Sequence, residues 1–241
     1  MAIFRPINAI LMIASLAVLS VPAQAQSLLT PHQAEYKVKI SVLGGQLNTE
    51  LTATETGYIA THTIQPTGMS RMLASGQIAE TARFARVPSG IRPQTFESTD
   101  TLTRDKTRAS VQFDWDLQEA SGTVNDEDFK SAMEGPAFDR VSIQYELMSD
   151  LLNNNTVDEY VLLDIDRLKK VQVRHIGNRT VNVPAGEFEA VGVQHQTIGS
   201  KRITTMWCVA ELDYLPVIIE QHRKGKLKMR AVLSNYRLLS T

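Results

Sequence analysis

The chain has 241 residues, and its 25 Lys and Arg nearly balance its 26 Asp and Glu, for a formal net charge of −1. Because 43% of the residues are hydrophobic, the chain can bury enough apolar surface to fold, which excludes a disordered protein. A near-neutral chain has no global positive field with which to hold a phosphate backbone, so we expect no nucleic-acid partner. A single cysteine forms neither an intrachain disulfide nor a structural zinc site.

The N-terminal residues have the pattern of a secretory signal peptide. Arg5 supplies a positive charge, Ile10–Val21 is an apolar run, and Ala23 and Ala25 occupy the two small positions of an A-x-A cleavage site. The apolar run is shorter than the about 20 residues that a transmembrane helix needs, which makes an uncleaved membrane anchor the less favoured alternative. We therefore expect cleavage after Ala25, leaving a single exported, periplasmic domain of residues 26–241 with no transmembrane segment.

Export changes the interpretation of the lone cysteine. In an oxidising compartment an exposed thiol pairs or oxidises, whereas a buried one is inert. Cys208 lies in the apolar stretch Met206–Ala210, so we predict a buried structural thiol rather than a nucleophile.

From Gln33 onward the dominant pattern has a period of two, which is typical of strands with one buried face. Gly44 and Gly45 predict a turn, Asp126–Asp128 predicts a loop, and the hairpin turns are expected at Pro184–Glu187 and Arg223–Lys226. The strands are expected at 35–42, 47–56, 58–64, 76–85, 94–103, 107–116, 122–124, 160–165, 170–176, 180–183, 188–197, 201–210, 216–222 and 226–236.

One segment, Asp139–Leu152, has helical periodicity instead. Val141, Tyr145 and Met148 recur at steps of three and four residues, and Asp139 stands where an N-cap belongs. The helix is expected to end at Asn153–Asn155, because asparagine tolerates the left-handed conformation of a C-cap.

Many strands and a single helix cannot remain a flat open sheet while burying an apolar face. We therefore expect an all-β fold, a curved antiparallel β-roll or half-barrel meander, with the central amphipathic helix covering its concave side. A parallel α/β fold is excluded, because the strands do not alternate with crossover helices.

Three segments, Phe138–Leu147, Val183–Val191 and Trp207–Glu220, contain an Asp-x-x-Ser helix start, a Pro-Ala-Gly hairpin and a Leu-Pro-Val strand. In order and spacing they resemble the bacterial exported family known as domain-of-unknown-function family 3108, over roughly residues 36–236. The resemblance implies an antiparallel β-roll in the bacterial envelope. It implies no established activity, so no catalytic residue is carried over.

The histidines lack the spacing of a metal site, since none forms H-x-H or H-E-x-x-H. We expect them to be single polar positions on solvated strand faces, although His175 and His195 could meet if their strands are neighbours. The five are His32, His62, His175, His195 and His222.

Three acidic pairs would each place two carboxylates on one strand face, an arrangement that suits calcium or a glycosidase. Arg167 and Lys169 lie near one pair and favour ion pairing instead. Neither a G-x-S-x-G motif nor a phosphate-binding loop is present, so we expect no metal, no cofactor and no catalytic residue. The pairs are Asp114/Asp116, Asp126/Asp128 and Asp164/Asp166.

The segment His222–Arg230 is the one marked charge asymmetry. Alternation predicts Lys226, Lys228 and Arg230 on one strand face. The segment is either a solvated hairpin, whose lysines discourage edge-to-edge pairing, or a surface for lipid headgroups, lipopolysaccharide or an acidic envelope polymer. The residues of this candidate anionic-ligand surface are Arg223, Lys224, Lys226, Lys228 and Arg230.

These features favour a non-enzymatic envelope protein that binds a lipid or another amphipathic small molecule in the concavity of its sheet, with the basic hairpin near the mouth. The alternative is a scaffold that docks another envelope protein by a sheet edge or the helix face. A hydrolase is the third hypothesis, and it would need a polar pocket with a perturbed acid or base.

Overall fold

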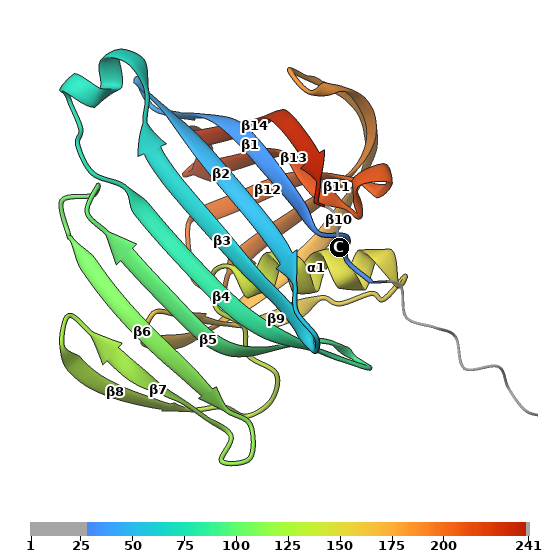
Figure 1. Cartoon of the computed structure of the whole chain (residues 1–241). Helices are drawn as coiled ribbons and strands as arrows, with labels where there is room; N and C mark the ends of the chain where they lie inside the picture. The colour runs from blue at the N-terminus through green and yellow to red at the C-terminus, as the bar shows by residue number, and fades with distance from the viewer. Residues whose placement is uncertain (1–27, 240–241) are drawn as a thin grey trace, which may run out of the picture.

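The structure is a computed structural model and describes residues 28–239. In this range a single 14-stranded sheet has the order β8-β7-β6-β5-β4-β3-β2-β1-β14-β13-β12-β11-β10-β9, with all neighbours antiparallel. The pairing of β1 with β14 joins two meanders, β1–β8 and β9–β14. Figure 1 shows that the sheet curves into a half-barrel with helix α1 on its concave side, which confirms the predicted fold class.

The elements have the following bounds: β1 His32–Ile40, β2 Leu43–Ala53, β3 Gly57–Pro66, η1 Gly68–Met72, β4 Ile78–Val87, β5 Gly90–Asp100, β6 Thr107–Asp114, β7 Glu119–Val124, β8 Glu127–Ala132, α1 Ser142–Leu152, β9 Glu159–Asp164, β10 Arg167–Val183, β11 Gly186–Thr197, β12 Arg202–Val209, η2 Ala210–Leu212, β13 Leu215–Arg223 and β14 Lys226–Leu238.

Strand β1 shows why the sheet forms where the period of two predicts it. Its even-numbered residues, from His32 to Val38, are buried and face the concave side, while Glu35, Lys37 and Lys39 are exposed. The predicted turns at Pro184–Glu187 and Arg223–Lys226 are also confirmed, because β10 gives way to β11 and β13 to β14 at these positions.

The turn predicted at Gly44 and Gly45 is wrong. The chain reverses at Ser41 and Val42, where Ser41 has a left-handed φ of 56°, and both glycines lie in β2. Gly45 serves close packing, since a Cβ there would lie 3.0 Å from the carbonyl oxygen of Gln65 on β3. Gly45 therefore marks a close approach of two strands, and neither glycine lies at the reversal.

Two strand predictions also differ from the structure. The loop expected at Asp126–Asp128 is a two-residue turn at Asn125 and Asp126, followed directly by edge strand β8. The two strands expected at 170–176 and 180–183 are one strand, β10, with a bulge between His175 and Asn178. Gly177, at a φ of 95°, supplies the conformation that this bulge requires.

Beyond that bulge, the β10–β11 hairpin bends over the convex face of β12 and β14. The backbone N–H of Ala185 donates to the carbonyl of Leu233 over 3.3 Å. The guanidinium of Arg179 lies 3.8 Å from the centroid of the Trp207 ring. Figure 1 shows this hairpin curling away from the main wall of the sheet. The hairpin thereby buries an apolar patch that a simple half-barrel would expose.

Helix α1 begins as predicted from Asp139. The Oδ1 atom of Asp139 accepts the backbone N–H groups of Val141 at 2.8 Å and Ser142 at 2.9 Å. In return, Ser142 Oγ accepts the backbone N–H of Asp139 at 3.0 Å and donates to its Oδ2 at 2.6 Å. This reciprocal cap lies wholly inside the protein, and burial raises the pKa of Asp139 to about 6. At the other end, Asn154 adopts the left-handed conformation with a φ of 57°.

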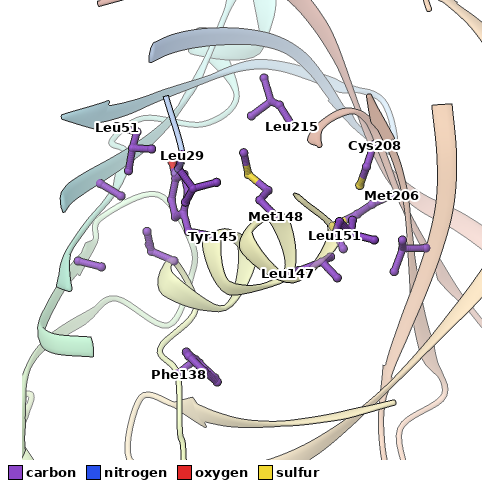
Figure 2. Packing of buried hydrophobic residues seen from close by; sticks show 14 of the residues in the cluster. Leu29, Leu51, Phe138, Tyr145, Leu147, Met148, Leu151, Met206, Cys208 and Leu215 are labelled. Atoms are coloured by element: carbon purple, nitrogen blue, oxygen red, sulfur yellow. The ribbon is translucent and has the colours of Figure 1, made fainter. Parts of the chain in front are cut away.

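The thiol of Cys208 is completely buried, as predicted, and burial raises its pKa to about 12. Figure 2 shows it on the sheet wall beside Met206, across from α1. The predicted signal peptide and its cleavage site lie outside the described residues. Within residues 28–239, no helix has the length and apolar character to cross a bilayer.

Candidate functional site

Helix α1 packs tightly against the wall made by β1–β5. The ring of Tyr145 is completely buried and stacks on Phe84, with the ring centroids 5.5 Å apart. Its hydroxyl lies 3.3 Å from Nε2 of His62. Figure 2 shows Tyr145 and Met148 pointing from the helix into the core, with Leu51 on the strand behind Tyr145.

A row of polar side chains crosses the concave face beneath the start of the helix. Thr49, His62, Glu80 and Ser98 lie directly opposite one another on β2, β3, β4 and β5. Arg140 reaches down from the helix start, with Nη2 2.5 Å from Glu80 Oε1 and 3.0 Å from Ser98 Oγ. Burial raises the pKa of Glu80, and the charge of Arg140 opposes that rise. The row therefore anchors the helix to the sheet.

The expectation that the histidines are single positions on solvated faces is wrong for His32 and His62, and for His195, which lines a pocket beside α1. His32 is 1% exposed, and its Nδ1 lies 2.8 Å from the carbonyl oxygen of Thr30. Burial lowers the pKa of His32, and it lowers the pKa of His62 to about 4, so both rings are neutral at pH 7. Both positions lie on the concave side of their strands, where alternation places core residues.

On its other side, α1 borders a pocket of about 380 Å³ between the helix and strands β9–β13. Its walls are mainly apolar, with Ile143 and Leu147 from the helix facing Met206 and Ile219 from the sheet. Polar side chains line the remainder. The full lining is Arg140, Ile143, Gln144, Leu147, Tyr160, Leu162, Asp164, Val171, Val173, His195, Gln196, Thr197, Ser200, Arg202, Thr204, Met206, Ile219 and Gln221.

Charged and neutral polar groups occupy different places in this pocket. Arg140 is held by Glu80, whereas Arg202 is exposed at the start of β12 and forms no ion pair among the described residues. His195 lies within the pocket, where desolvation lowers its pKa to about 4. A ligand in the pocket would thus meet the neutral imidazole of His195 and, at the exposed part of the lining, the unpaired guanidinium of Arg202. The sequence predicted a ligand in the concavity of the sheet but did not identify these lining residues, because nothing in the strand pattern marks where packing leaves space.

The basic hairpin adjoins this exposed part of the lining. Arg223 lies directly opposite Arg202 on one side and Lys226 on the other, so the three share the pocket face of the sheet. A bulge in the β13–β14 ladder then leaves Lys228 without a direct partner, and Arg230 lies opposite Glu220 on the convex face, where the two form a 3.5 Å ion pair.

The prediction that Lys226, Lys228 and Arg230 share one face is therefore wrong, because the bulge adds one residue and reverses the alternation. All five residues of the candidate anionic-ligand surface, Arg223, Lys224, Lys226, Lys228 and Arg230, are exposed. Their binding of an anionic ligand stays a prediction.

A second cleft, of about 1000 Å³, lies between the end of α1, the segment after β8, and strands β9 and β10. It contains two carboxylates of one helix face that sequence reasoning missed, although their spacing of four residues was a signal. Glu146 Oε2 accepts the backbone N–H of Ile91 at 2.8 Å, and burial raises its pKa to about 8. Asp150 Oδ2 accepts the hydroxyl of Tyr160 at 2.6 Å. These bonds fix the helix to β5 and β9.

The acidic pairs do not present two carboxylates on one strand face. Asp114 accepts the backbone N–H groups of the turn that follows it, and Asp164 pairs with Lys169, as predicted. His175 and His195 are on neighbouring strands but oppose Val193 and Val173, not each other. Within the part of the chain that the structure describes, no three His, Cys, Asp or Glu residues cluster as metal ligands would.

Residues 33–232 match the family described as "Protein of unknown function (DUF3108)". The chain belongs to this family. The resemblance in the three sequence segments is thereby confirmed, and the family assigns no specific function. None of the curated proteins matches the chain.

Among solved structures, the fold is similar to that of a β-barrel-like protein of the unknown-function family DUF1849 from Brucella abortus. The TM-score is 0.58 at 11% identity, with 88% of this chain and 99% of that chain covered. An exported protein with a YmcC-like fold from Bacteroides fragilis gives 0.34 at 15% identity, covering 86% and 95%. A lipoprotein from Parabacteroides distasonis gives 0.30 at 13% identity, covering 88% and 96%.

Proposed function

We propose that this member of the DUF3108 family is a non-enzymatic binding module of the bacterial periplasm that holds a lipid or another amphipathic ligand in the pocket beside α1. The single observation that carries the proposal is a pocket of about 380 Å³ with largely apolar walls and, in its lining, the exposed Arg202, unpaired among the described residues. Small-molecule pockets are typically of about 300–1,000 Å³, mainly apolar, with a few polar groups that orient the ligand. Export rests on the signal-peptide pattern that ends at Ala25.

The lining divides the ligand into two parts. An acyl chain or comparable apolar group would lie between Ile143 and Leu147 of the helix and Met206 and Ile219 of the sheet. Burying apolar ligand surface there is favourable by about 25 cal/mol per Å². An anionic head would lie toward Arg202, whose charge meets no carboxylate within ion-pair distance among the described residues.

Native mass spectrometry of the protein purified without detergent tests this function. We expect a species heavier than the polypeptide by the mass of one small amphipathic molecule, which organic extraction removes and identifies. Crosslinking in the periplasm serves as the comparison. If the chain is always recovered free of small molecules and instead crosslinks to one envelope protein, the scaffold alternative holds and the proposed function is wrong.

A further inference from the structure

Four neighbouring loops at one end of the half-barrel form a continuous surface, which we call the basic rim. It lies at the end of the sheet where η1 stands clear of the strands in Figure 1. Its segments are 39–45, between β1 and β2; 65–77, which contains η1; 197–203, between β11 and β12; and 221–229, between β13 and β14.

Hydrogen bonds between the segments hold the rim together, so its loops lie side by side despite their distance in sequence. These bonds run from Gly44 N to Ser70 Oγ at 2.7 Å, from Ser41 N to Lys228 O at 3.2 Å, and from Lys224 N to Lys201 O at 3.2 Å.

Large apolar side chains point into solvent along the rim. The β1–β2 turn and η1 carry the most exposed of them, with Val42 at 85%, Met72 at 84% and Met69 at 82%. Contiguous exposed apolar groups on a folded protein are typical of an interaction site. The exposed apolar residues of the rim are Ile40, Val42, Met69, Met72, Leu73, Ile198 and Leu227.

The same segments carry only positive charge. They contain no Asp or Glu, and none of their Lys or Arg residues forms an ion pair within residues 28–239. Acidic residues lie in other loops: Glu55, Asp116, Glu211 and Asp213 at the opposite end of the sheet, and Asp105, Asp126 and Asp166 in the β5–β6, β7–β8 and β9–β10 loops at the same end as the rim. The exposed cations of the rim are Lys39, Arg71, Lys201, Arg202, Arg223, Lys224, Lys226 and Lys228.

We propose that the basic rim docks the protein on the surface of an anionic lipid bilayer. Exposed apolar side chains among unpaired cations match a bilayer interface, where the apolar groups enter the boundary of the acyl region and the cations meet the phosphates. A protein partner would require carboxylates matched to eight cations on four loops, whereas an anionic bilayer offers phosphates at every position. Charge complementarity therefore favours the bilayer.

This surface goes beyond the ligand pocket and does not depend on it. Thr197, Ser200, Arg202 and Gln221 belong to both, so a molecule leaving the pocket at this end would emerge at the docked surface. Variants that test the rim therefore leave these four residues unchanged, so that loss of docking can be separated from loss of ligand.

Sedimentation of the purified protein with vesicles tests the rim. The vesicles contain phosphatidylcholine, with or without phosphatidylglycerol as the anionic lipid. We expect binding to the anionic vesicles only, and weaker binding at high salt. The charge variant K224E/K228E should reduce the affinity at least tenfold, and the apolar variant M69S/M72S/L73S should reduce it by a similar factor. Matched controls are K130E on edge strand β8 and L117S at the opposite end of the sheet.

Both rim variants should keep the mass of the pocket ligand and the thermal unfolding midpoint of the parent, which shows that they fold. Three results would overturn the docking surface: no binding of the parent to anionic vesicles, equal binding to neutral ones, or losses in the controls as large as in the rim variants. None of these results would bear on the pocket ligand, which is measured separately by mass.

Discussion

The two sides of helix α1 are packed in different ways. Toward β1–β5, Tyr145 is fully enclosed, and polar bonds from Arg140 and Glu146 tie the helix to the sheet at fixed points. Toward β9–β13, Asp150 accepts the hydroxyl of Tyr160 near the end of the helix, but Ile143 is only half-buried and borders open space. A protein interior is normally filled to the density of an organic crystal. The contrast indicates that one side of the helix serves stability, while the other keeps a pocket open.

The largest loss of stability is expected on the side of α1 that faces β1–β5, which we call the filled side. Tyr145→Ala removes a buried aromatic ring and its contacts with Phe84 and His62, so we expect a loss of about 4 kcal/mol in the free energy of unfolding. Urea denaturation followed by circular dichroism measures it. A loss below about 1 kcal/mol would show that this side is not the stabilising one.

The second test concerns the turn between β4 and β5, where the carboxylate of Glu146 packs against Gly90. Gly90 has a φ of 134°, and a Cβ there would lie 2.5 Å from the carboxylate oxygens of Glu146. Gly90→Ala should therefore cost about 3 kcal/mol through backbone strain and displacement of the carboxylate. Gly135→Ala is the matched control, because a Cβ at Gly135 meets nothing within 4 Å. Equal unfolding midpoints for the two variants would contradict the account.

Glu146 also gives the filled side a pH dependence. Burial raises the pKa of Glu146 from 4.5 to about 8. The contribution of the protonated Glu146 to the free energy of unfolding is therefore fully present below pH 4.5 and is lost as the pH rises through 8. Glu146→Gln keeps an acceptor for the Ile91 N–H and carries no charge, so at pH 8 it should be more stable than the parent by about 2 kcal/mol. Urea titrations at pH 5, 6.5 and 8 measure the difference, with the exposed Glu187→Gln as control. If the free energy of unfolding varies with pH in the same way for the parent and E146Q, Glu146 is not the source of this pH dependence.

The smallest stability effect is expected on the pocket side. Ile143→Ala removes a side chain that is already half-exposed to the pocket, so the free energy of unfolding should fall by about 1 kcal/mol or less. The same substitution should weaken binding of an acyl ligand several-fold. If instead I143A destabilises the protein as much as Y145A, the two sides of the helix are equivalent and the contrast disappears.

The parts of the fold that follow from local patterns were predictable. The alternation of β1, the Asp139 cap and the burial of Cys208 each depend on neighbouring residues, and the structure has all three. Strand β8 was missed because it is a polar edge strand with exposed Glu127 and Asp128, and such a strand has no apolar alternation.

The candidate site was less predictable, because it depends on contacts between distant segments. His62 was predicted on a solvated strand face, but packing of Tyr145 against it leaves it half-buried. The bulge at Lys228 reverses the face of the basic residues without a glycine or proline to mark it. The pocket is the space left between the helix and a curved sheet, which no local pattern encodes.

We propose that this space holds an amphipathic ligand, and titration with a fluorescent acyl-chain probe measures whether it does. Gln221→Trp places an indole in the pocket, whereas His222→Trp places one on the opposite face of the same strand. We expect the parent and H222W to bind one probe per chain, and Q221W to lose at least tenfold in affinity while unfolding at the midpoint of the parent. Equal probe affinity in Q221W and H222W, or no saturable binding to the parent, would contradict the account.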